Sequence, residues 1–292
     1  LKILIIINNY LFRYIWMPDG EVNTLLLNQL VNILSVYPFL DFYLFVSIFL
    51  THNNINSVRN SNYASGRPIK VIVHGWNNNG QSPMNPLITS AFLAVQDCNV
   101  IVVDWRALAN SNYNTAAAGV PGIGTSLGNF LVWLIGNAGG NWNNVHLVGF
   151  SLGAHVVGSA GRRAGGRASR VTDYLKIVLQ IFYPAGPRWN GNSNALSSNA
   201  GVYVEAIHTD GHLLGIFNRV GNADFYPNGG KNPQPGCLIS TCSHGRSNDL
   251  FASTVRFNRL VGRLCPNLGS AELGRCTGST FNMGNAIINK RG

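Results

Sequence analysis

The chain has 292 residues, of which 46% are hydrophobic, and its mixed glycine and proline content indicates an ordinary globular protein with one α/β domain as the first expectation. Lysine and arginine outnumber aspartate and glutamate by 21 to 11, which gives a net charge of +10. The basic residues are scattered and do not alternate with aromatic ones, so the sequence argues against a nucleic-acid binder and favours attraction to anionic lipid or cell surfaces.

The N-terminal region resembles a targeting segment only in part. Residues 1–15 contain one early lysine and an apolar run of about the length of a signal-peptide core, but asparagines interrupt it and no small-residue cleavage site or initiator methionine accompanies it. We interpret residues 1–20 as a degraded or incomplete signal or N-terminal segment and residues 21–292 as a single domain. Residues 39–50 are too few to span a bilayer and include Asp41, so we predict a buried strand there and no membrane-spanning helix in the chain.

Strands and helices alternate through the rest of the chain. Apolar runs predict strands at residues 70–74, 99–105, 145–150, 177–183 and 202–207, and helical periodicity predicts helices at residues 85–97 and 124–136. This alternation predicts an α/β fold with a mostly parallel central sheet and helices on both faces. In such folds the functional loops gather at the carboxyl ends of the strands.

The most informative motif is Gly149-Phe150-Ser151-Leu152-Gly153, between a predicted strand and a predicted helix. It matches the G-x-S-x-G nucleophile elbow, in which the serine hydroxyl projects above the sheet. The backbone N–H of Leu152 then points at the same spot from the positive end of the helix. Two glycines among 33 can be spaced this way by chance, but the flanking strand and helix favour a nucleophile.

A second motif, His74-Gly75-Trp76, ends the first regular strand. In α/β hydrolases a turn of this type supplies a second donor to the oxyanion hole, here the backbone N–H of Trp76. The alternative is a simple turn from strand to loop.

A serine nucleophile requires a general base, and seven histidines are available. Hydrolases of this architecture place the base last in the chain, which leaves His208, His212 and His244. We predict His244 as the base because it lies in a polar loop that a disulfide next to it would stiffen. His208 ends an apolar strand and is predicted to be structural, and its i, i+4 spacing to His212 is poor evidence for a metal pair off a helix.

The five cysteines indicate an oxidising compartment. Four of them form two close pairs in the last quarter of the chain, which resemble small disulfide loops more than zinc ligands. Cys98 is left over, either as a small buried side chain or as half of a bridge whose partner this chain lacks.

Seven motifs in order resemble the pancreatic-lipase-type lipases, most closely their insect secreted members and the related phospholipases A1. They are VIVHGWNNNG, NVIVVDW, HLVGFSLGAHVVGSAGRR, PAGPRW, YVEAIHTDG, DFYPNGGKNPQPGC and CSHGRS, spread over residues 68–286. The resemblance implies an α/β-hydrolase fold, secretion, a lipid or phospholipid substrate met at a membrane or lipid surface, and no metal or organic cofactor. It also implies these residue roles: Ser151 as nucleophile, His244 as base, Trp76 and Leu152 as oxyanion donors, and disulfides Cys237–Cys242 and Cys265–Cys276.

The chain departs from this family at the catalytic acid. Eleven residues separate Thr172 from Pro184 where the family has three, and Tyr183 occupies the position of the family's aspartate. A phenol with a pKa near 10 cannot stabilise an imidazolium as a carboxylate does. If residues 177–183 form the strand, Asp173 lies roughly 33 Å from its active end, so we predict Asp210, after the next strand, as the acid.

Two further departures shape the functional prediction. Only four residues separate Cys237 from Cys242, too few for the long lid of triglyceride lipases, which favours the short-lid, phospholipase-like branch. The chain ends at Gly292, before the β-sandwich domain that pancreatic lipases append. We predict a secreted serine ester hydrolase acting on lipids. The alternative is a catalytically impaired lipase-fold protein that binds or stores lipid, since the usual acid is missing.

Overall fold

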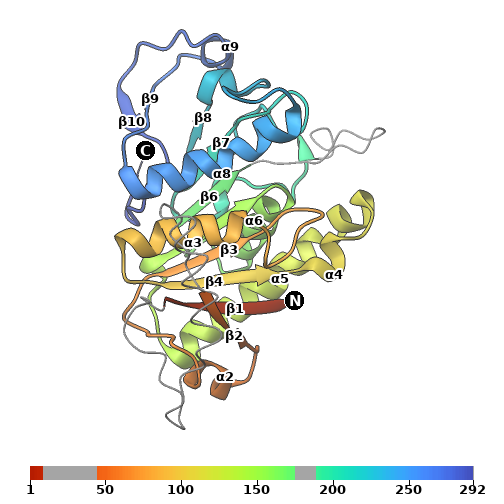
Figure 1. The fold of residues 1–292 in the computed structure, drawn as a ribbon, viewed down its shortest axis with the longest axis vertical. Coiled ribbons are helices and arrows are strands. Elements are labelled where there is room, and N and C mark those ends of the chain that lie inside the picture. The colour runs from red at the N-terminus through yellow and green to blue at the C-terminus, as the bar shows by residue number, and fades with distance from the viewer. Residues whose placement is uncertain (9–44, 175–188, 292) are drawn as a thin grey trace, which may run out of the picture.

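The structure, a computed structural model, describes residues 1–8, 45–174 and 189–291. Its main feature is an eight-stranded sheet of order β2-β1-β4-β3-β5-β6-β7-β8 (Figure 1). The strands are β1 Lys2–Asn8, β2 Phe45–Leu50, β3 Ile69–Val73, β4 Asn99–Asp104, β5 Val145–Phe150, β6 Arg170–Tyr174, β7 Val204–Ile207 and β8 Ala223–Phe225. The six adjacent strands β4-β3-β5-β6-β7-β8 are parallel, and β1 and β2 run antiparallel at one edge. The predicted, mostly parallel α/β-hydrolase sheet is therefore confirmed.

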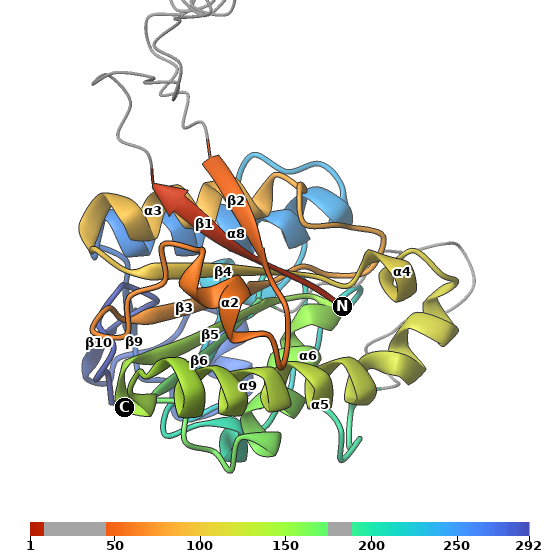
Figure 2. The same ribbon diagram turned by 90° about the horizontal axis from the view of Figure 1, so that it is seen from below.

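Helices cover both faces of the sheet (Figures 1 and 2). They are α2 Ile55–Arg59, α3 Met84–Val95, α4 Arg106–Ala109, α5 Tyr113–Ala138, α6 Leu152–Arg163, α8 Ser240–Phe257 and α9 Leu268–Glu272, with short 3₁₀ turns at η1 Trp142–Asn144, η2 Ser198–Ala200 and η3 Pro227–Gly230. A small hairpin of β9 Val261–Arg263 and β10 Thr280–Asn282 lies beside β8.

Alternate residues of each central strand face opposite layers. Val71 and Leu147 pack in the cluster formed with α5 and α6, whereas Val148 and Phe150 pack in the cluster formed with α3 and α8. Both faces of the sheet are therefore buried. This explains why β3, β4 and β5 are largely apolar and do not alternate regularly between apolar and polar residues.

The N-terminal predictions need correction. Lys2–Asn8 pairs with β2 on one side and β4 on the other, so these residues are a strand of the sheet rather than a segment outside the domain. The strand predicted at residues 39–50 begins, within the described residues, at Phe45. It is an edge strand whose Phe49 is 55% exposed, so the expectation of burial is wrong there.

The helix predicted at residues 124–136 is longer than expected. Helix α5 begins after Asn112, whose side chain accepts the Thr115 N–H, and it contains Pro121. By length and composition it is the one helix in the described parts of the chain that could cross a membrane, which the sequence analysis did not anticipate. Because it packs along α6 and buries residues such as Leu127 and Phe130, we interpret it as a core helix.

The strand between β5 and β7 is β6, Arg170–Tyr174, and residues 177–183, where we predicted a strand, lie outside the described residues. Asp173 pairs in register with Gly149, two residues before Ser151. The predicted separation of 33 Å is therefore wrong. At the spacing of neighbouring strands, the Cα atoms of Asp173 and Ser151 lie within roughly 10 Å of each other.

A buried ionic network ties the last described residues to the sheet. Arg170 of β6 donates to Glu205 of β7 at 3.2 Å and to the backbone carbonyls of residues 284, 285 and 287. Glu205 also accepts from Lys290 and from the backbone N–H of Gly284. The two strands and the segment of residues 284–290 thus share one set of buried charges.

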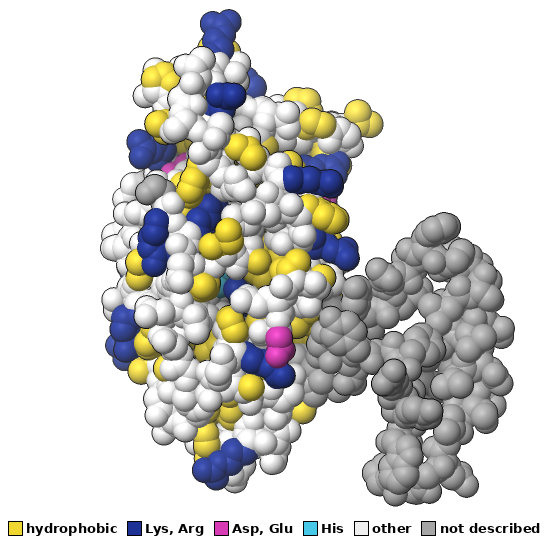
Figure 3. Space-filling model, turned by 90° about the vertical axis from the view of Figure 1, so that its left-hand side faces the viewer, with side chains coloured by type: hydrophobic (Ala, Val, Ile, Leu, Met, Phe, Trp, Pro, Cys, Tyr) yellow, Lys and Arg dark blue, Asp and Glu magenta, His cyan; other side chains and the backbone are white. Residues whose placement is uncertain are grey.

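Most of the other lysine and arginine side chains are spread over the surface. On the face at the left of Figure 1, shown in Figure 3, lysine and arginine are scattered among polar and apolar side chains, and acidic ones are few. This distribution agrees with the absence of a basic run in the sequence.

Candidate active site

The elbow has the strained geometry that its motif predicts. Ser151, at the carboxyl end of β5, has φ 64° and ψ −129°, a conformation that a non-glycine residue rarely adopts and that costs about 1–3 kcal/mol. Helix α6 begins at the next residue, so the turn aims the serine at the carboxyl edge of the sheet. Its Oγ is buried and has no hydrogen-bond partner among the described residues.

Close packing explains two of the glycines. A Cβ on Gly75 would lie 2.4 Å from Ser151 Cβ, and a Cβ on Gly153 would lie 2.3 Å from the carbonyl oxygen of Val73. Both distances are impossible for real side chains. The turn after β3 and the turn after β5 can therefore touch only because these positions lack side chains.

The oxyanion donors predicted from sequence lie on these touching turns. The Trp76 indole donates to the Ser111 carbonyl at 2.7 Å and meets Tyr113 edge-on, which fixes the turn after β3. Leu152 is the first residue of α6, where the helix dipole is positive. In the described parts of the chain, no acceptor takes the backbone N–H of Trp76 or Leu152.

His74 is a structural support for this turn. Its ring is buried and stacked on Trp105, its Nδ1 lies 2.9 Å from the Gly75 carbonyl oxygen, and its Nε2 accepts the Trp105 N–H at 3.1 Å. Burial raises the pKa of the adjacent Asp104, but contacts with His74 and Arg106 outweigh burial and hold that pKa well below its usual range.

The predicted base, His244, is fully buried and contacts the residue before Ser151. Its ring stacks on Phe150, the residue before Ser151, with a centroid distance of 5.8 Å. The expectation of a loop is wrong, because His244 is the fifth residue of α8. The helix begins at Ser240 although its first turns contain serines and a glycine, which have low helix propensity. The buried contacts of these turns outweigh that low propensity.

Asp210 lies beside the same helix. It follows β7 by three residues, and its Oδ2 accepts the hydroxyl hydrogen of Ser240, the first residue of α8. The neighbouring Thr209 donates to the His244 carbonyl at 3.4 Å. Burial raises the pKa of Asp210 to about 6, and the Ser240 hydrogen bond opposes part of that rise. Sequence reasoning missed Ser240, although its place between the paired cysteines was a signal.

Asp173 lies on the other side of the sheet. Val171, two residues earlier, packs toward α5 and α6, so Asp173 faces the same layer and not the layer of α8. Both carboxylate oxygens are buried without a partner among the described residues, and burial raises the pKa of Asp173 well above its usual range. Tyr183 lies outside the described residues.

The remaining histidines have structural partners. His208 contacts the Ile216 carbonyl at 2.7 Å and Asp224 at 2.9 Å, which agrees with its predicted structural role. The exposed His212 contacts Glu272. Across residues 1–8, 45–174 and 189–291, no three histidine, cysteine or acidic side chains gather as metal ligands would.

Both predicted disulfides, Cys237–Cys242 and Cys265–Cys276, are present, and Cys98 is a buried free thiol. The first bridge joins the segment after β8 to the first turn of α8. The two residues inside its loop that precede the helix, Leu238 and Ile239, are 98% and 62% exposed.

Solved structures of similar shape include the carboxylesterase Cest-2923 from Lactobacillus plantarum, which is 13% identical, with 82% of this chain and 97% of that chain covered and a TM-score of 0.36. An acetyl xylan esterase from Aspergillus awamori is 14% identical, with 69% of this chain and 76% of that chain covered and a TM-score of 0.35. At such scores we base no conclusion on these likenesses.

The curated relatives match more strongly. Lipase member H-A of Xenopus laevis is 35% identical over 219 residues, which cover 70% of this chain and 45% of the relative. Pancreatic lipase-related protein 2 of Bos taurus is 31% identical over 251 residues, which cover 76% of this chain and 52% of the relative. Lipoprotein lipase of Rattus norvegicus is 31% identical over 267 residues, which cover 80% of this chain and 54% of the relative. The chain spans about half the length of these relatives. The family model named Lipase matches residues 47–287, and the chain therefore belongs to the lipase family.

Proposed function

We propose that this chain is a secreted serine hydrolase that cleaves carboxylic esters of lipids through an acyl-enzyme on Ser151. The observation that carries the proposal is the strained backbone of Ser151, held at the carboxyl edge of the sheet beside the N–H groups of Trp76 and Leu152, which have no acceptor among the described residues. Strain of this kind persists where the surrounding structure enforces it, and it clusters at active sites.

The reaction proceeds in two halves. His244 takes the proton of Ser151 as Oγ attacks the ester carbonyl, and the N–H groups of Trp76 and Leu152 stabilise the resulting oxyanion. The tetrahedral intermediate collapses, His244 gives its proton to the departing alcohol oxygen, and the acyl group remains on Ser151. Water, deprotonated by His244, then attacks the acyl-enzyme, and the second tetrahedral intermediate collapses as His244 returns the proton to Ser151 Oγ and the fatty acid leaves. Each step uses this chain and water, so the scheme requires no cofactor.

Asp210 is our proposed acid. It contacts the helix that carries His244, and with a pKa of about 6 it is mostly ionised at neutral pH. Asp173 faces the opposite layer, and burial raises its pKa well above the usual range of a carboxyl group, which favours the neutral form. A protonated carboxyl cannot stabilise an imidazolium, which favours Asp210 of the two.

The substrate class follows from the family and from the short loop beside the base. The curated relatives are named as lipases, and we extend lipid-ester hydrolysis to this chain as part of the proposal. Four residues between Cys237 and Cys242 leave the site without a long lid, which favours phospholipid or short-chain ester. The exposed Leu238 and Ile239 and the net positive charge suit peripheral contact with a lipid surface.

A second candidate is a lipase-fold protein that binds lipid without turnover. It is favoured by Tyr183 in the place of the family's aspartate and by the bonding of Asp210 to Ser240. Loss of an orienting carboxylate lowers kcat by about 10⁴ in serine hydrolases.

Labelling with a fluorophosphonate ester separates the two candidates, because the reagent requires an activated serine. We expect covalent labelling of the wild type, detected by intact mass, and none in Ser151→Ala or His244→Ala. Ser126→Ala, at an exposed serine of α5 that the mechanism does not use, serves as the control and should label normally. Labelling of a different serine, or none in the folded wild type, would refute the proposal.

A further inference from the structure

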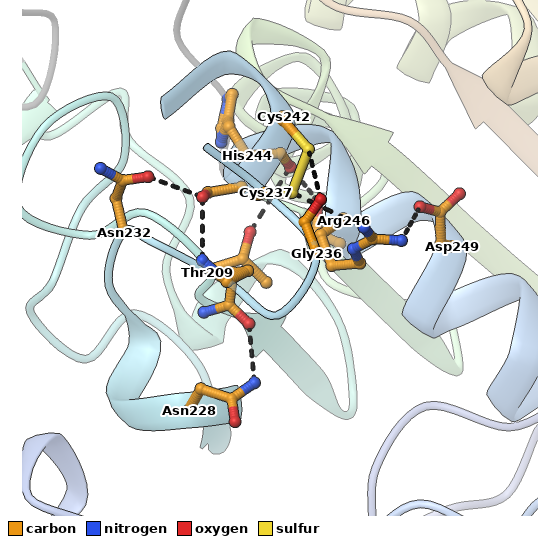
Figure 4. The surroundings of a disulfide bond; sticks show 12 residues. Thr209, Asn228, Asn232, Gly236, Cys237, Cys242, His244, Arg246 and Asp249 are labelled. Carbon is orange, nitrogen blue, oxygen red and sulfur yellow. Dashed lines mark hydrogen bonds and ion pairs between the residues drawn. A yellow bond between two sulfur atoms is a disulfide. The ribbon is translucent and has the colours of Figure 1, made fainter. Parts of the chain in front are cut away.

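The first turn of α8 is held by a buried hydroxyl that the mechanism does not use. Ser243, next to His244, is fully buried. Its Oγ donates to Asn232 Oδ1 at 2.7 Å and accepts the backbone N–H of Gln234 at 2.9 Å (Figure 4). Both partners lie in the segment after η3, so one side chain joins the helix of the base to the connection that follows β8.

The segment that holds Ser243 is itself fixed. The side chain of Gln234 is buried, and its amide nitrogen donates to the carbonyls of Pro227 at 2.8 Å and Lys231 at 2.9 Å. Its amide oxygen accepts from Asn228 at 3.0 Å, as Figure 4 shows. Ser243 is therefore attached to a rigid partner, and the attachment can define the rotation of the helix about its own axis.

The rotation of this turn determines where the imidazole lies. The ring of His244 packs on Phe150, and its carbonyl accepts from Thr209 and from Ser247. Because a side chain extends roughly 6 Å from the helix axis, a rotation of about 10° displaces the imidazole by about 1 Å. A displacement of that size can lower the rate of a positioned reaction by about 100-fold.

We propose that Ser243, with Asn232 as its acceptor, is a positioning residue for His244. Its hydroxyl sets the rotation of the first turn of α8 and so aligns the imidazole with Ser151. This inference rests on the proposed function, since it assumes that His244 is the base.

The test measures two quantities across pH: the rate constant for fluorophosphonate labelling, and kcat and KM on the soluble ester p-nitrophenyl butyrate. We expect Ser243→Ala to lower the labelling rate and kcat by about 10- to 100-fold, to change KM little and to shift the midpoint of the pH–rate profile. Asn232→Ala should act in the same direction. The double variant should be no slower than Ser243→Ala, because Ser243→Ala already removes the hydrogen bond that Asn232→Ala removes. Ser243→Thr, which retains the hydroxyl, should restore most of the rate.

Ser169→Ala is the matched control. Ser169 is also buried, and it donates to the Ile288 carbonyl at 3.2 Å just before β6, at the opposite end of the strands. It should lower Tm comparably while leaving the rate and the pH midpoint at wild-type values.

Wild-type rate and pH midpoint in Ser243→Ala, with a Tm loss like that of Ser169→Ala, would overturn the inference. Should Ser243→Ala fail to fold, Asn232→Ala decides by the same criteria, since it leaves the bond from Gln234 in place. Absence of labelling in the wild type would instead refute the proposed function, and the positioning role with it.

Discussion

The nucleophile side and the acid side of the site differ in how they are built. The proposed nucleophile, Ser151, and both proposed oxyanion donors come from two short turns on neighbouring strands, and the turns touch directly at Gly75. His244 comes from a helix and Asp210 from a loop 34 residues earlier in the chain. Asp210 is bonded to Ser240, four residues before His244. The position of Ser151 therefore depends on the backbone conformation of two adjacent turns. The positions of His244 and Asp210 depend on how a helix and a distant loop pack against each other.

The largest effect should come from the acid side. If Asp210 is the acid, Asp210→Asn lowers kcat by about 10⁴ while the protein stays folded, because only the orientation and charge stabilisation of the imidazole are lost. Asp173→Asn should leave kcat nearly unchanged, since that carboxyl faces the other layer. Steady-state kinetics on a soluble ester, with circular dichroism for folding, measure both.

The transcript gives an independent check on the acid side. If residues 173–183 include translated non-coding sequence, the messenger RNA lacks about eight of their codons and encodes aspartate before Pro184. A transcript that does encode Tyr183, together with an Asp210→Asn variant as active as wild type, would contradict both accounts of the acid.

On the nucleophile side, Gly75→Ala should lower kcat by about 10²- to 10³-fold, the range for losing one oxyanion donor. The added Cβ would lie only 2.4 Å from Ser151 Cβ and would push the Trp76 turn away from Ser151. Gly66→Ala, where no atom lies within 4 Å of the added carbon, is the control. Equal kinetics for the two variants would argue against the oxyanion role of that turn.

The pH dependence connects activity with stability at Asp210. Because its pKa is raised to about 6, activity should fall as the pH drops through 6 and the carboxylate is protonated. The folded state binds this proton more tightly than the unfolded state, so Asp210 destabilises the fold increasingly between about pH 4 and pH 6, and this destabilisation is constant at higher pH. The free energy of unfolding of Asp210→Asn, relative to wild type, should therefore be higher at pH 8 than at pH 4 by up to about 3 kcal/mol. Denaturant melts at the two pH values test this, and an equal difference at both would exclude the raised pKa.

The smallest expected effect concerns the short loop beside the base. With four residues between Cys237 and Cys242, there is no long lid to open, so adding an oil interface to dispersed phospholipid or short-chain ester should cause no sharp rise in rate. Rate against substrate concentration, followed through the solubility limit, shows whether a rise occurs. A marked jump, or a strong preference for long-chain triglyceride, would contradict the short-lid interpretation.

The same contrast explains which predictions from sequence succeeded. The elbow geometry of Ser151 follows from residues adjacent to it in sequence, so the motif was sufficient. The position of Asp173 could not be predicted, because the apolar residues 177–183 resemble a strand as much as Arg170–Tyr174 does, and only pairing with β5 and β7 decides between them. The helix around His244 was missed for a related reason, since its first turn depends on distant partners such as Asn232 and Asp210.

The buried network of Arg170, Glu205 and Lys290 has a consequence for the order of folding. Until the segment around Lys290 docks, Arg170 and Glu205 would leave the donors and acceptors now bonded to residues 284–290 unpaired inside the sheet. The part of the sheet formed by β6 and β7 therefore cannot become stable much before residues 284–290 arrive. A nascent chain should remain sensitive to protease in β6 and β7 until residue 290 has left the ribosome.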